Sequence, residues 1–389
     1  MKTVLISGAS VAGLALAQRL HAHGYAPTVV ERAPAVRRGG HAIDVRGAAL
    51  TVLDRMGLLD GARRARTRTR GMSMLDGDGN ELWRSTEMTY SAGRLDSDDI
   101  ELWRSTEMTY SAGRLDSDDI ELLREDLTAL LHRNADAHTT FLFGDAIAAL
   151  DQAPDGVHVT FAGGARRTYD YVVGADGLHS GVRRLVFGPD AHHLRHLGSY
   201  VAVFTADNFL GLRDWQIWCQ GESATYCVYP ARDNTELRVT LGFRSEPLDH
   251  DHRDTAAHKA LLAARLESLG ADTPKLLDAM RTAPDFYFDA MAQVHMDRWS
   301  RGRVALVGDA GYCASPLSGQ GTSLALAGAY VLAEELGRSA DPATALPRYE
   351  ERKRPYVESN QALATENPGE GPSEESLERA KNALVLGEM

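Results

Sequence analysis

Apolar positions near the start of the chain form a short run, then a helical repeat, then a second run. Residues 4–6 are continuously apolar, which is typical of a buried parallel strand. Leucine and alanine recur at helical spacing over residues 14–20, and Gly24 ends this helix. Residues 28–30 form the second apolar run, which stops at Glu31. This order of strand, helix and strand predicts a βαβ unit, and therefore an α/β fold built on a parallel sheet.

The turn between the first strand and the helix carries the glycine pattern of dinucleotide-binding proteins. Gly8 permits a tight turn, and Gly13 lets the helix pack closely on the sheet. Ser10 stands where this pattern has its middle glycine, and serine is small enough to admit a phosphate. Free N–H groups at the helix start, including those of Val11 and Ala12, are expected to face the phosphates. The glutamate that ends the second strand is placed to accept hydrogen bonds from ribose hydroxyls.

Farther along the chain the apolar pattern alternates between helical and strand periods. Helical spacing predicts helices over residues 50–56, 121–131, 255–269, 274–280 and 321–336, and over the last fifty residues apart from a loop at 367–372. Apolar–polar alternation and Asp-Gly turns predict strands at 71–75, 140–176, 200–245, 286–296 and 303–307. The strands between residues 200 and 245 are expected to form an antiparallel sheet rich in aromatic side chains.

A stretch of twenty residues occurs twice in tandem. Residues 81–100 and 101–120 both read ELWRSTEMTYSAGRLDSDDI. Solenoid repeats diverge and recur at least three times, so this pair indicates either a recent duplication or an error in the recorded sequence. Only the second copy continues into the amphipathic helix that carries Arg124, whereas Arg104 takes the corresponding place after the first copy. We expect the other copy to form an extra surface loop or hairpin beside the substrate sheet.

Composition and charge exclude several functional classes. The chain has 389 residues, of which 43% are hydrophobic and 25% charged, as in ordinary soluble globular proteins. The formal net charge of −12 argues against a nucleic-acid partner. The arginine-rich stretch at residues 63–70 is expected to be a solvated loop or helix end, with attraction of a phosphorylated cofactor such as NADPH as the alternative.

Cysteine usage and hydropathy point to the cytoplasm. Cys219, Cys227 and Cys313 show no CxxC spacing, which favours reduced thiols and argues against a zinc site. No apolar run is long enough to span a bilayer, so we expect no stable membrane association. A secretory signal is disfavoured because Gly8, Ser10 and Gly13 interrupt the N-terminal apolar run.

Three motifs from separate parts of the chain form one set. They are GASVAG with Glu31, then residues 174–180 (GADGLHS), then Gly308-Asp309-Ala310 followed by Pro316 and residues 319–321 (GQG). As a set they resemble the class A flavoprotein monooxygenases of the para-hydroxybenzoate hydroxylase fold. Among these, polyketide hydroxylases and tetracycline-inactivating monooxygenases look most similar, over the chain to about residue 350.

The resemblance implies a fold and a division of the chain. The expected fold class is α/β, with a Rossmann-like FAD-binding domain, an antiparallel β-sheet substrate domain and C-terminal helices. The FAD-binding domain would comprise residues 1–70, 121–190 and 297–340. A substrate-domain hairpin with the duplication would span 71–120, the substrate-binding sheet 191–296, and the C-terminal helices 341–389.

The resemblance also implies the cofactors FAD and NADPH, with O2 as co-substrate, and assigns residues to them. Arg32 would lie near the adenine, Arg124 would reach the FAD phosphate or ribitol, and Asp309 would bind a hydroxyl of the FAD chain. The N-terminus of the helix after the third motif would face the flavin ring. The full set of implied cofactor-binding residues is Gly8, Ser10, Val11, Ala12, Gly13, Glu31, Arg32, Arg38, Asp44, Arg46, Arg124, Asp176, Asp309, Pro316, Gly319, Gln320, Gly321 and Thr322.

The implied chemistry belongs to the cofactor: NADPH reduces FAD, and a flavin C4a-hydroperoxide transfers oxygen to an aromatic or enolic small molecule. No catalytic side chain is then required, although Arg46 would lie near the ring, and no metal is expected. Trp215, Tyr226 and Tyr229 are the aromatic residues assigned to the substrate pocket. The histidine-rich stretch at 190–196 is interpreted as a solvated loop.

Two other functions remain open on the sequence. One is a flavoprotein that has lost oxygenase activity through the twenty-residue insertion and acts as a ligand-binding protein. The other is an isoprenoid reductase of the same fold, which would have a membrane-facing apolar tail where this chain is rich in glutamate. Halogenation is disfavoured because the tryptophan-rich WxWxIP signature of flavin halogenases is absent.

Overall fold

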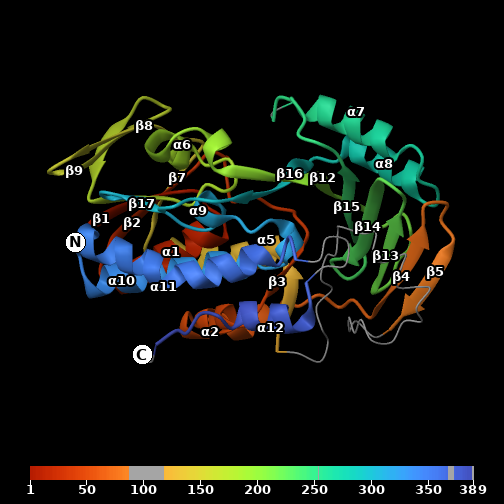
Figure 1. Ribbon diagram of the computed structural model, residues 1–389, viewed down its shortest axis with the longest axis horizontal. Helices are drawn as coiled ribbons and strands as arrows, with labels where there is room; N and C mark the ends of the chain where they lie inside the picture. The colour runs from red at the N-terminus through yellow and green to blue at the C-terminus, as the bar shows by residue number, and fades with distance from the viewer. Residues whose placement is uncertain (87–117, 253, 367–371, 388–389) are drawn as a thin grey trace.

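A computed structural model describes residues 1–86, 118–252, 254–366 and 372–387, and its centre is a six-stranded sheet (Figure 1). Its strand order is β17-β18-β11-β1-β2-β7, and all neighbouring pairs are parallel except the edge pair β17–β18. This confirms the expected βαβ unit and parallel sheet. The strands are β1 (Thr3–Ser7), β2 (Ala26–Glu31), β7 (Thr140–Phe143), β11 (Tyr171–Gly174), β17 (Ser300–Arg301) and β18 (Val304–Leu306).

Helices cover this sheet and bury its apolar side chains. Helix α1 (Val11–Ala22) packs between α10 (Gly321–Arg338) and α5 (Arg124–Asp136), and α11 (Pro342–Ala362) lies along α10 (Figure 1). The apolar repeat of α1 is buried in the core, as its spacing predicts. The remaining helices are α2 (Ala48–Arg55), α3 (Leu59–Arg64), α6 (Gly181–Phe187), α9 (Asp309–Tyr312), α12 (Glu374–Lys381) and the 3-10 turns η1 (Asp190–His192) and η2 (Pro316–Ser318).

A second, seven-stranded sheet stands beside the first (Figure 1). Its order is β16-β12-β15-β14-β13-β4-β5, and all of its neighbouring pairs are antiparallel except β13–β4. Helices α7 (Thr255–Leu266) and α8 (Thr273–Thr282) bury one face of it. The strands are β4 (Gly71–Asp76), β5 (Glu81–Ser85), β12 (Leu194–Asp207), β13 (Trp215–Gln220), β14 (Ala224–Ala231), β15 (Glu236–Arg244) and β16 (Tyr287–Val294).

Two smaller sheets complete the fold. One is a hairpin sheet of β8 (Ile147–Ala153), β9 (Gly156–Phe161) and β10 (Arg166–Tyr169). The other pairs β3 (Ala42–Val45) with β6 (Ile120–Leu123). Both strands belong to stretches of chain that connect the two large sheets. None of the described helices is both long and apolar enough to cross a membrane.

The ends of the tandem repeat take different structures. The first copy begins as β5, at the edge of the seven-stranded sheet, and the second copy ends in β6. Helix α5 begins at Arg124, which confirms that the second copy leads into this helix. The helix predicted from residue 121 was wrong by three residues, because Leu122 and Leu123 are buried in β6. Residues 87–117, with Arg104 and the expected extra hairpin, lie outside the described residues, as does most of the loop expected at 367–372.

The first glycine motif is packed too closely to admit side chains. A Cβ at Gly13 would lie 2.0 Å from the Gly8 carbonyl oxygen. Gly8 itself has a φ of +110°, and a Cβ there would lie 2.4 Å from the Ala175 carbonyl oxygen. The sequence interpretation of both glycines, a tight turn and close helix packing, is therefore confirmed.

Replacing Gly13 with alanine is therefore expected to destabilise the fold. Overpacking a close contact costs about 1–3 kcal/mol, and here the contact is with backbone, which cannot rotate away. Urea denaturation of the purified variant measures the loss. Gly181→Ala is the matched control, because a Cβ at Gly181 would meet only Asp176 Oδ2, at 3.5 Å. Equal stability of the parent and Gly13→Ala would contradict the packing argument.

Candidate functional site

The three sequence motifs meet at the carboxyl edge of the parallel sheet. Strands β1 and β11 are neighbours, so the turn after Gly8 lies against the turn that contains Ala175 and Asp176. Gly308, two residues after the end of β18, lies over the start of α1, where its Cβ would be 3.1 Å from that of Ala12. Open α/β sheets bind their ligands at this edge. The convergence makes it the candidate cofactor site.

Glu31 is built into the glycine turn. Its carboxylate is buried and accepts hydrogen bonds from the N–H groups of Ala9 and Ala33, both at 2.9 Å. Each carboxylate oxygen can accept a further hydrogen bond, so the predicted contact with a ribose remains a prediction. Arg32 and Arg38, also assigned to the cofactor, have exposed side chains on the loop that follows.

Arg124 places a cation without a carboxylate partner beside this edge. Its Nη2 donates to the Gly39 carbonyl oxygen at 3.3 Å, and no salt bridge to it occurs among the residues that the structure describes. Burial, and then the charge of Arg37, lower the pKa of Arg124. The next residue, Glu125, already accepts from Arg238 at 2.7 Å and from the Gly39 N–H at 2.8 Å. Arg124 is therefore suited to an external anion such as a phosphate.

Asp309 begins α9 at the tip of the third motif. It is solvent-accessible, yet burial, and then the charge of Asp289, raise the pKa of its carboxyl. Gly308 precedes it with a φ of +65°, which favours glycine. The side chain is thus sheltered by protein and still reachable, as a residue that binds a ligand hydroxyl must be.

The GQG segment leaves open space at the start of α10. Gly319 is left-handed, with a φ of +63°, and follows Pro316 in η2, while Thr322 stands half-buried in the first turn of α10. Gln320 stands at the N-cap position of α10 and is fully buried. Among the described residues, neither its amide nitrogen nor its amide oxygen has a hydrogen-bond partner. Apart from its chain neighbours and its own helix, a Cβ at Gly321 would meet no atom of the described residues within 4 Å. Unpartnered buried amide atoms and an open helix N-terminus both fit a polar, electron-rich group bound here.

A buried ion pair lies at the end of β3, and a backbone hydrogen bond connects it to the same helix start. Arg46 Nη2 lies 2.8 Å from Asp44 Oδ2, and the Arg46 N–H donates to Ser323 Oγ at 3.0 Å. Burial opposes the charge of Arg46, but the carboxylates of Asp44, Asp119 and Glu121 outweigh it and raise the pKa of Arg46. The structure thus brings Asp44 and Arg46 next to the GQG segment, as expected for residues near the ring.

Asp176 is engaged by its own turn. Its carboxylate accepts hydrogen bonds from Ser180 Oγ and from the N–H groups of Gly181 and Val182, at 2.9 and 3.2 Å. Burial raises the pKa of this carboxyl in spite of these bonds. These hydrogen bonds hold the turn that leads into α6. A role of Asp176 in binding both FAD and NADPH remains a prediction.

The structure separates the three aromatic residues assigned to the substrate. Tyr226 is buried under α7 and α8, and Trp215 lies on the same face of the sheet, where its Nε1 donates to Ser73 Oγ at 3.0 Å. Tyr229 lies on the opposite face, and its hydroxyl accepts from the Ala42 N–H at 2.5 Å. Of these three residues, Tyr229 contacts β3, and its role in substrate binding stays a prediction. Trp215 and Tyr226 lie on the face of the sheet turned away from β3, which argues against their assignment to the same pocket. Trp218 shares the face of Tyr229.

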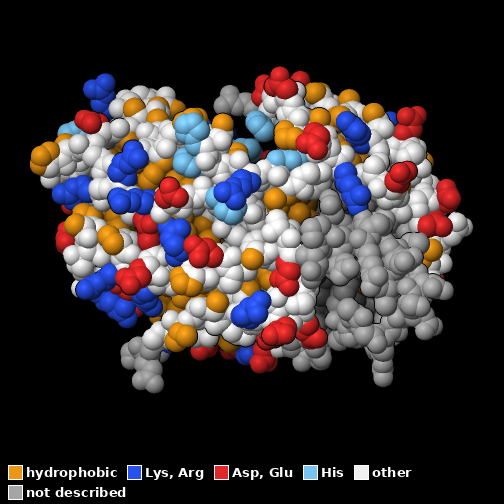
Figure 2. Space-filling model, in the orientation of Figure 1, with side chains coloured by type: hydrophobic (Ala, Val, Ile, Leu, Met, Phe, Trp, Pro, Cys, Tyr) orange, Lys and Arg blue, Asp and Glu red, His pale blue; other side chains and the backbone are white. Residues whose placement is uncertain are grey.

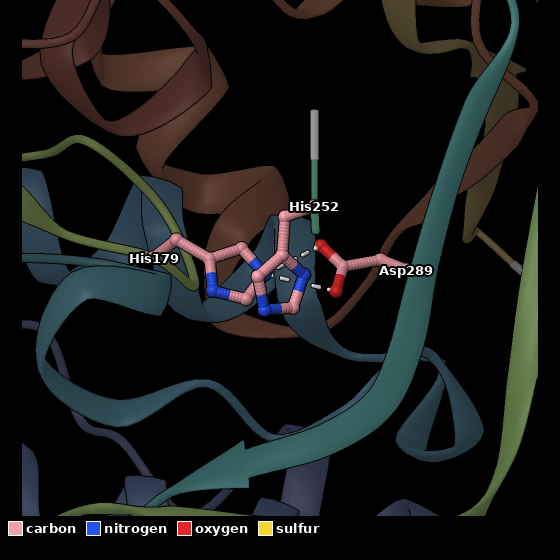
Figure 3. A group of neighbouring side chains, drawn as sticks. All are labelled: His179, His252 and Asp289. Atoms are coloured by element: carbon pink, nitrogen blue, oxygen red, sulfur yellow. Dashed lines mark hydrogen bonds and ion pairs between the residues drawn. The ribbon is translucent and has the colours of Figure 1, made fainter. Parts of the chain in front are cut away.

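A group of histidines lies near the site, and the sequence reasoning missed it. His179 Nε2 lies 2.9 Å from Asp289 Oδ1 (Figure 3). The Tyr287 hydroxyl donates to Asp289 Oδ2 at 2.8 Å. Burial opposes the charge of Asp289, but His179 and Tyr287 hold the pKa of its carboxyl below its usual value. The ring of His252 lies against that of His179 in a tilted arrangement, with centroids 4.5 Å apart. Figure 2 shows histidine side chains around an opening on this face.

Two sequence signals pointed to this group. His179 belongs to the second motif, and residues 249–252 read Asp-His-Asp-His. In the histidine-rich stretch at 190–196, by contrast, Asp190 forms ion pairs with Arg183 and Arg184.

The basic run at 63–70 is partly neutralised. Two acidic residues in loops of the seven-stranded sheet, Asp214 and Asp233, form ion pairs with arginines of this run.

His41 makes the stability of the FAD-free protein depend on pH. Burial, and then the charge of Arg124, lower its pKa to about 4. Between pH 6.5 and 4 the unfolded chain binds more protons at this position, so the contribution of His41 to the unfolding free energy is lost as the pH falls. We expect His41→Gln to lose less stability than the parent across this window, by on the order of 2 kcal/mol. Parallel curves of unfolding free energy against pH would contradict this.

A family model described as "FAD binding domain" matches residues 1–364. The chain belongs to this family of FAD-binding proteins. It is 50% identical to an uncharacterized protein of Mycobacterium tuberculosis, with 99% of each chain covered. It is 39% identical to a flavin-dependent monooxygenase from an unknown prokaryotic organism, covering all of this chain and 96% of the relative. The crystal structure of tetracycline destructase Tet(51) superposes over the whole of both chains, with a TM-score of 0.85 and 30% identity.

These similarities confirm the resemblance and the fold class, and they extend beyond residue 350, where the resemblance was expected to stop. The protein is a flavin-dependent monooxygenase and therefore an oxidoreductase that uses FAD. The described residues fit the cofactor: a cation without a carboxylate partner, an open helix N-terminus and a sheltered carboxylate surround the edge where the motifs meet.

Proposed function

We propose that this monooxygenase uses NADPH and O2 to hydroxylate an aromatic or enolic small molecule of polyketide type. The observation that carries the proposal is that the three motifs meet at one edge of the parallel sheet. This edge lies beside the face of the seven-stranded sheet that carries Tyr229. Similarity to a tetracycline destructase supports a fused-ring substrate, and the aromatic side chains of Tyr229 and Trp218 suit a flat one.

The residues at the sheet edge would hold FAD along its length. Glu31 and the N-terminus of α1 would take the adenosine ribose and the pyrophosphate, and Arg124 would neutralise a phosphate charge. Asp309 would accept a hydrogen bond from a hydroxyl of the linking chain. Bound FAD would supply the redox chemistry, namely the acceptance of a hydride from a nicotinamide and the activation of O2.

The chain's own residues would orient the flavin ring and shelter it from water. The N-terminus of α10, with Gly321 leaving room, would stabilise negative charge on the ring beside it. The buried pair of Asp44 and Arg46 holds two opposite charges fixed near the same point, away from solvent. Tyr229 and Trp218 would exclude water from the substrate face, which protects the activated oxygen from wasteful release.

Substrate-stimulated NADPH oxidation tests this proposal. The FAD-loaded protein is mixed with NADPH, or with NADH for comparison, and with a panel of phenols, phenolic polyketides and tetracyclines. We expect at least one fused-ring compound to accelerate NADPH oxidation and to gain one oxygen atom. A panel in which no compound changes the oxidation rate would instead favour a flavoprotein that only binds its ligand.

A further inference from the structure

Three potential metal ligands from distant parts of the chain converge beside the flavin site. His179 comes from the turn after β11, Asp289 from β16, and His252 from the segment before α7 (Figure 3). One ligand atom from each lies within 4.8 Å of the others. Asp289 is buried, His179 is half-buried and His252 is exposed, so protein encloses one side of the group and the other side is open to solvent.

The distances match those between ligands of one ion. His179 Nε2 lies 2.9 and 3.0 Å from the two oxygens of Asp289. With Zn–N and Zn–O bonds near 2.1 Å, two ligands of the same zinc ion lie about 2.9–3.4 Å apart. A cation can therefore replace the proton that His179 and Asp289 share, and a rotation of the exposed His252 side chain completes the set.

A supporting hydrogen bond is already present. The Tyr287 hydroxyl donates to Asp289 Oδ2 at 2.8 Å and orients the carboxylate from outside the group. Metal sites regularly carry such outer hydrogen bonds, which fix the ligand geometry.

We propose that His179, His252 and Asp289 bind one divalent transition-metal ion of the zinc class. Two imidazoles with one carboxylate favour zinc and its neighbours over magnesium or calcium, which prefer oxygen ligands. Three protein ligands leave a further position for water. The ion joins the turn of the second motif to the seven-stranded sheet and to the segment before α7. This departs from the sequence expectation of no metal, and it is independent of the substrate proposal.

Zinc titration of the untagged, FAD-loaded protein tests the site. The protein is freed of metal with a chelator and titrated with zinc chloride by calorimetry, with metal analysis after dialysis. We expect one zinc per chain. His252→Ala removes an exposed ligand and should retain its flavin; its zinc affinity should fall by more than the ~10- to 100-fold loss expected for the outer-shell variant Tyr287→Phe.

His158→Ala is the matched control, since His158 also pairs with an aspartate, Asp155, at 3.0 Å, but on the exposed β8–β9 hairpin. Its zinc binding should equal that of the parent. Failure of the parent to bind one zinc would overturn the proposal. Equal affinity of the parent and His252→Ala would overturn it too, because zinc would then sit elsewhere, for instance on the FAD phosphates.

Discussion

Replacing Arg124 with alanine is expected to weaken FAD binding about 100-fold, because a charge-assisted hydrogen bond contributes ~1.5–3 kcal/mol and an arginine can make two of them to a phosphate. Arg124 has no salt bridge within the described residues, and burial already penalises its charge. A bound phosphate would therefore compensate a positive charge that no salt bridge within the described residues already compensates. Flavin fluorescence during titration of the flavin-free protein with FAD measures the affinity.

The tandem repeat supplies the control for this experiment. Arg104 follows the first copy as Arg124 follows the second, with nearly the same residues before it. We expect Arg104→Ala to bind FAD like the parent, because only Arg124 is followed by the amphipathic pattern of α5. A severe defect in Arg104→Ala and none in Arg124→Ala would reverse the assignment of the two copies.

Replacing Asp309 with alanine is expected to lower the affinity for FAD about 10- to 100-fold, since a hydrogen bond to a charged group contributes ~1.5–3 kcal/mol. The carboxylate is sheltered enough to have a raised pKa and is still solvent-accessible, so a hydroxyl of a ligand can reach it. Asp309→Asn, which keeps one acceptor oxygen, should bind FAD with intermediate affinity.

Asp155→Ala is the control for Asp309, because Asp155 is an exposed aspartate on the β8–β9 hairpin. Its FAD affinity and its flavin absorption spectrum should match those of the parent. If Asp309→Ala bound FAD with unchanged affinity, Asp309 would not contact the cofactor, and the third motif would serve only to turn the chain.

Local sequence signals were sufficient for the cofactor side of the molecule. Gly13 is required by a contact within its own motif, with the Gly8 carbonyl oxygen, and the apolar runs around the motif correspond directly to strand and helix. The close approach of Gly8 to Ala175 follows from the pairing of β1 with β11. Because parallel strands place their carboxyl ends at one edge, the order of the motifs was enough to predict that they meet.

The substrate side depended on information that no local pattern carries. Alternation along β14 correctly sets Tyr226 and Tyr229 on opposite faces, but it does not say which face α7 and α8 cover. The pair of His179 and Asp289 is separated by 110 residues and forms only once β16 lies beside the second motif. Such pairs follow from the packing of the two sheets.

The most direct test of monooxygenase function is to follow the oxygen atom itself. The FAD-loaded protein, NADPH and a substrate that accelerates its oxidation are incubated under isotopically labelled dioxygen, and the product is analysed by mass spectrometry. We predict that the product carries one labelled oxygen atom, and that Arg124→Ala, assayed without added FAD, forms much less of it. Turnover to a product whose added oxygen comes from water, or that gains none, would contradict the account.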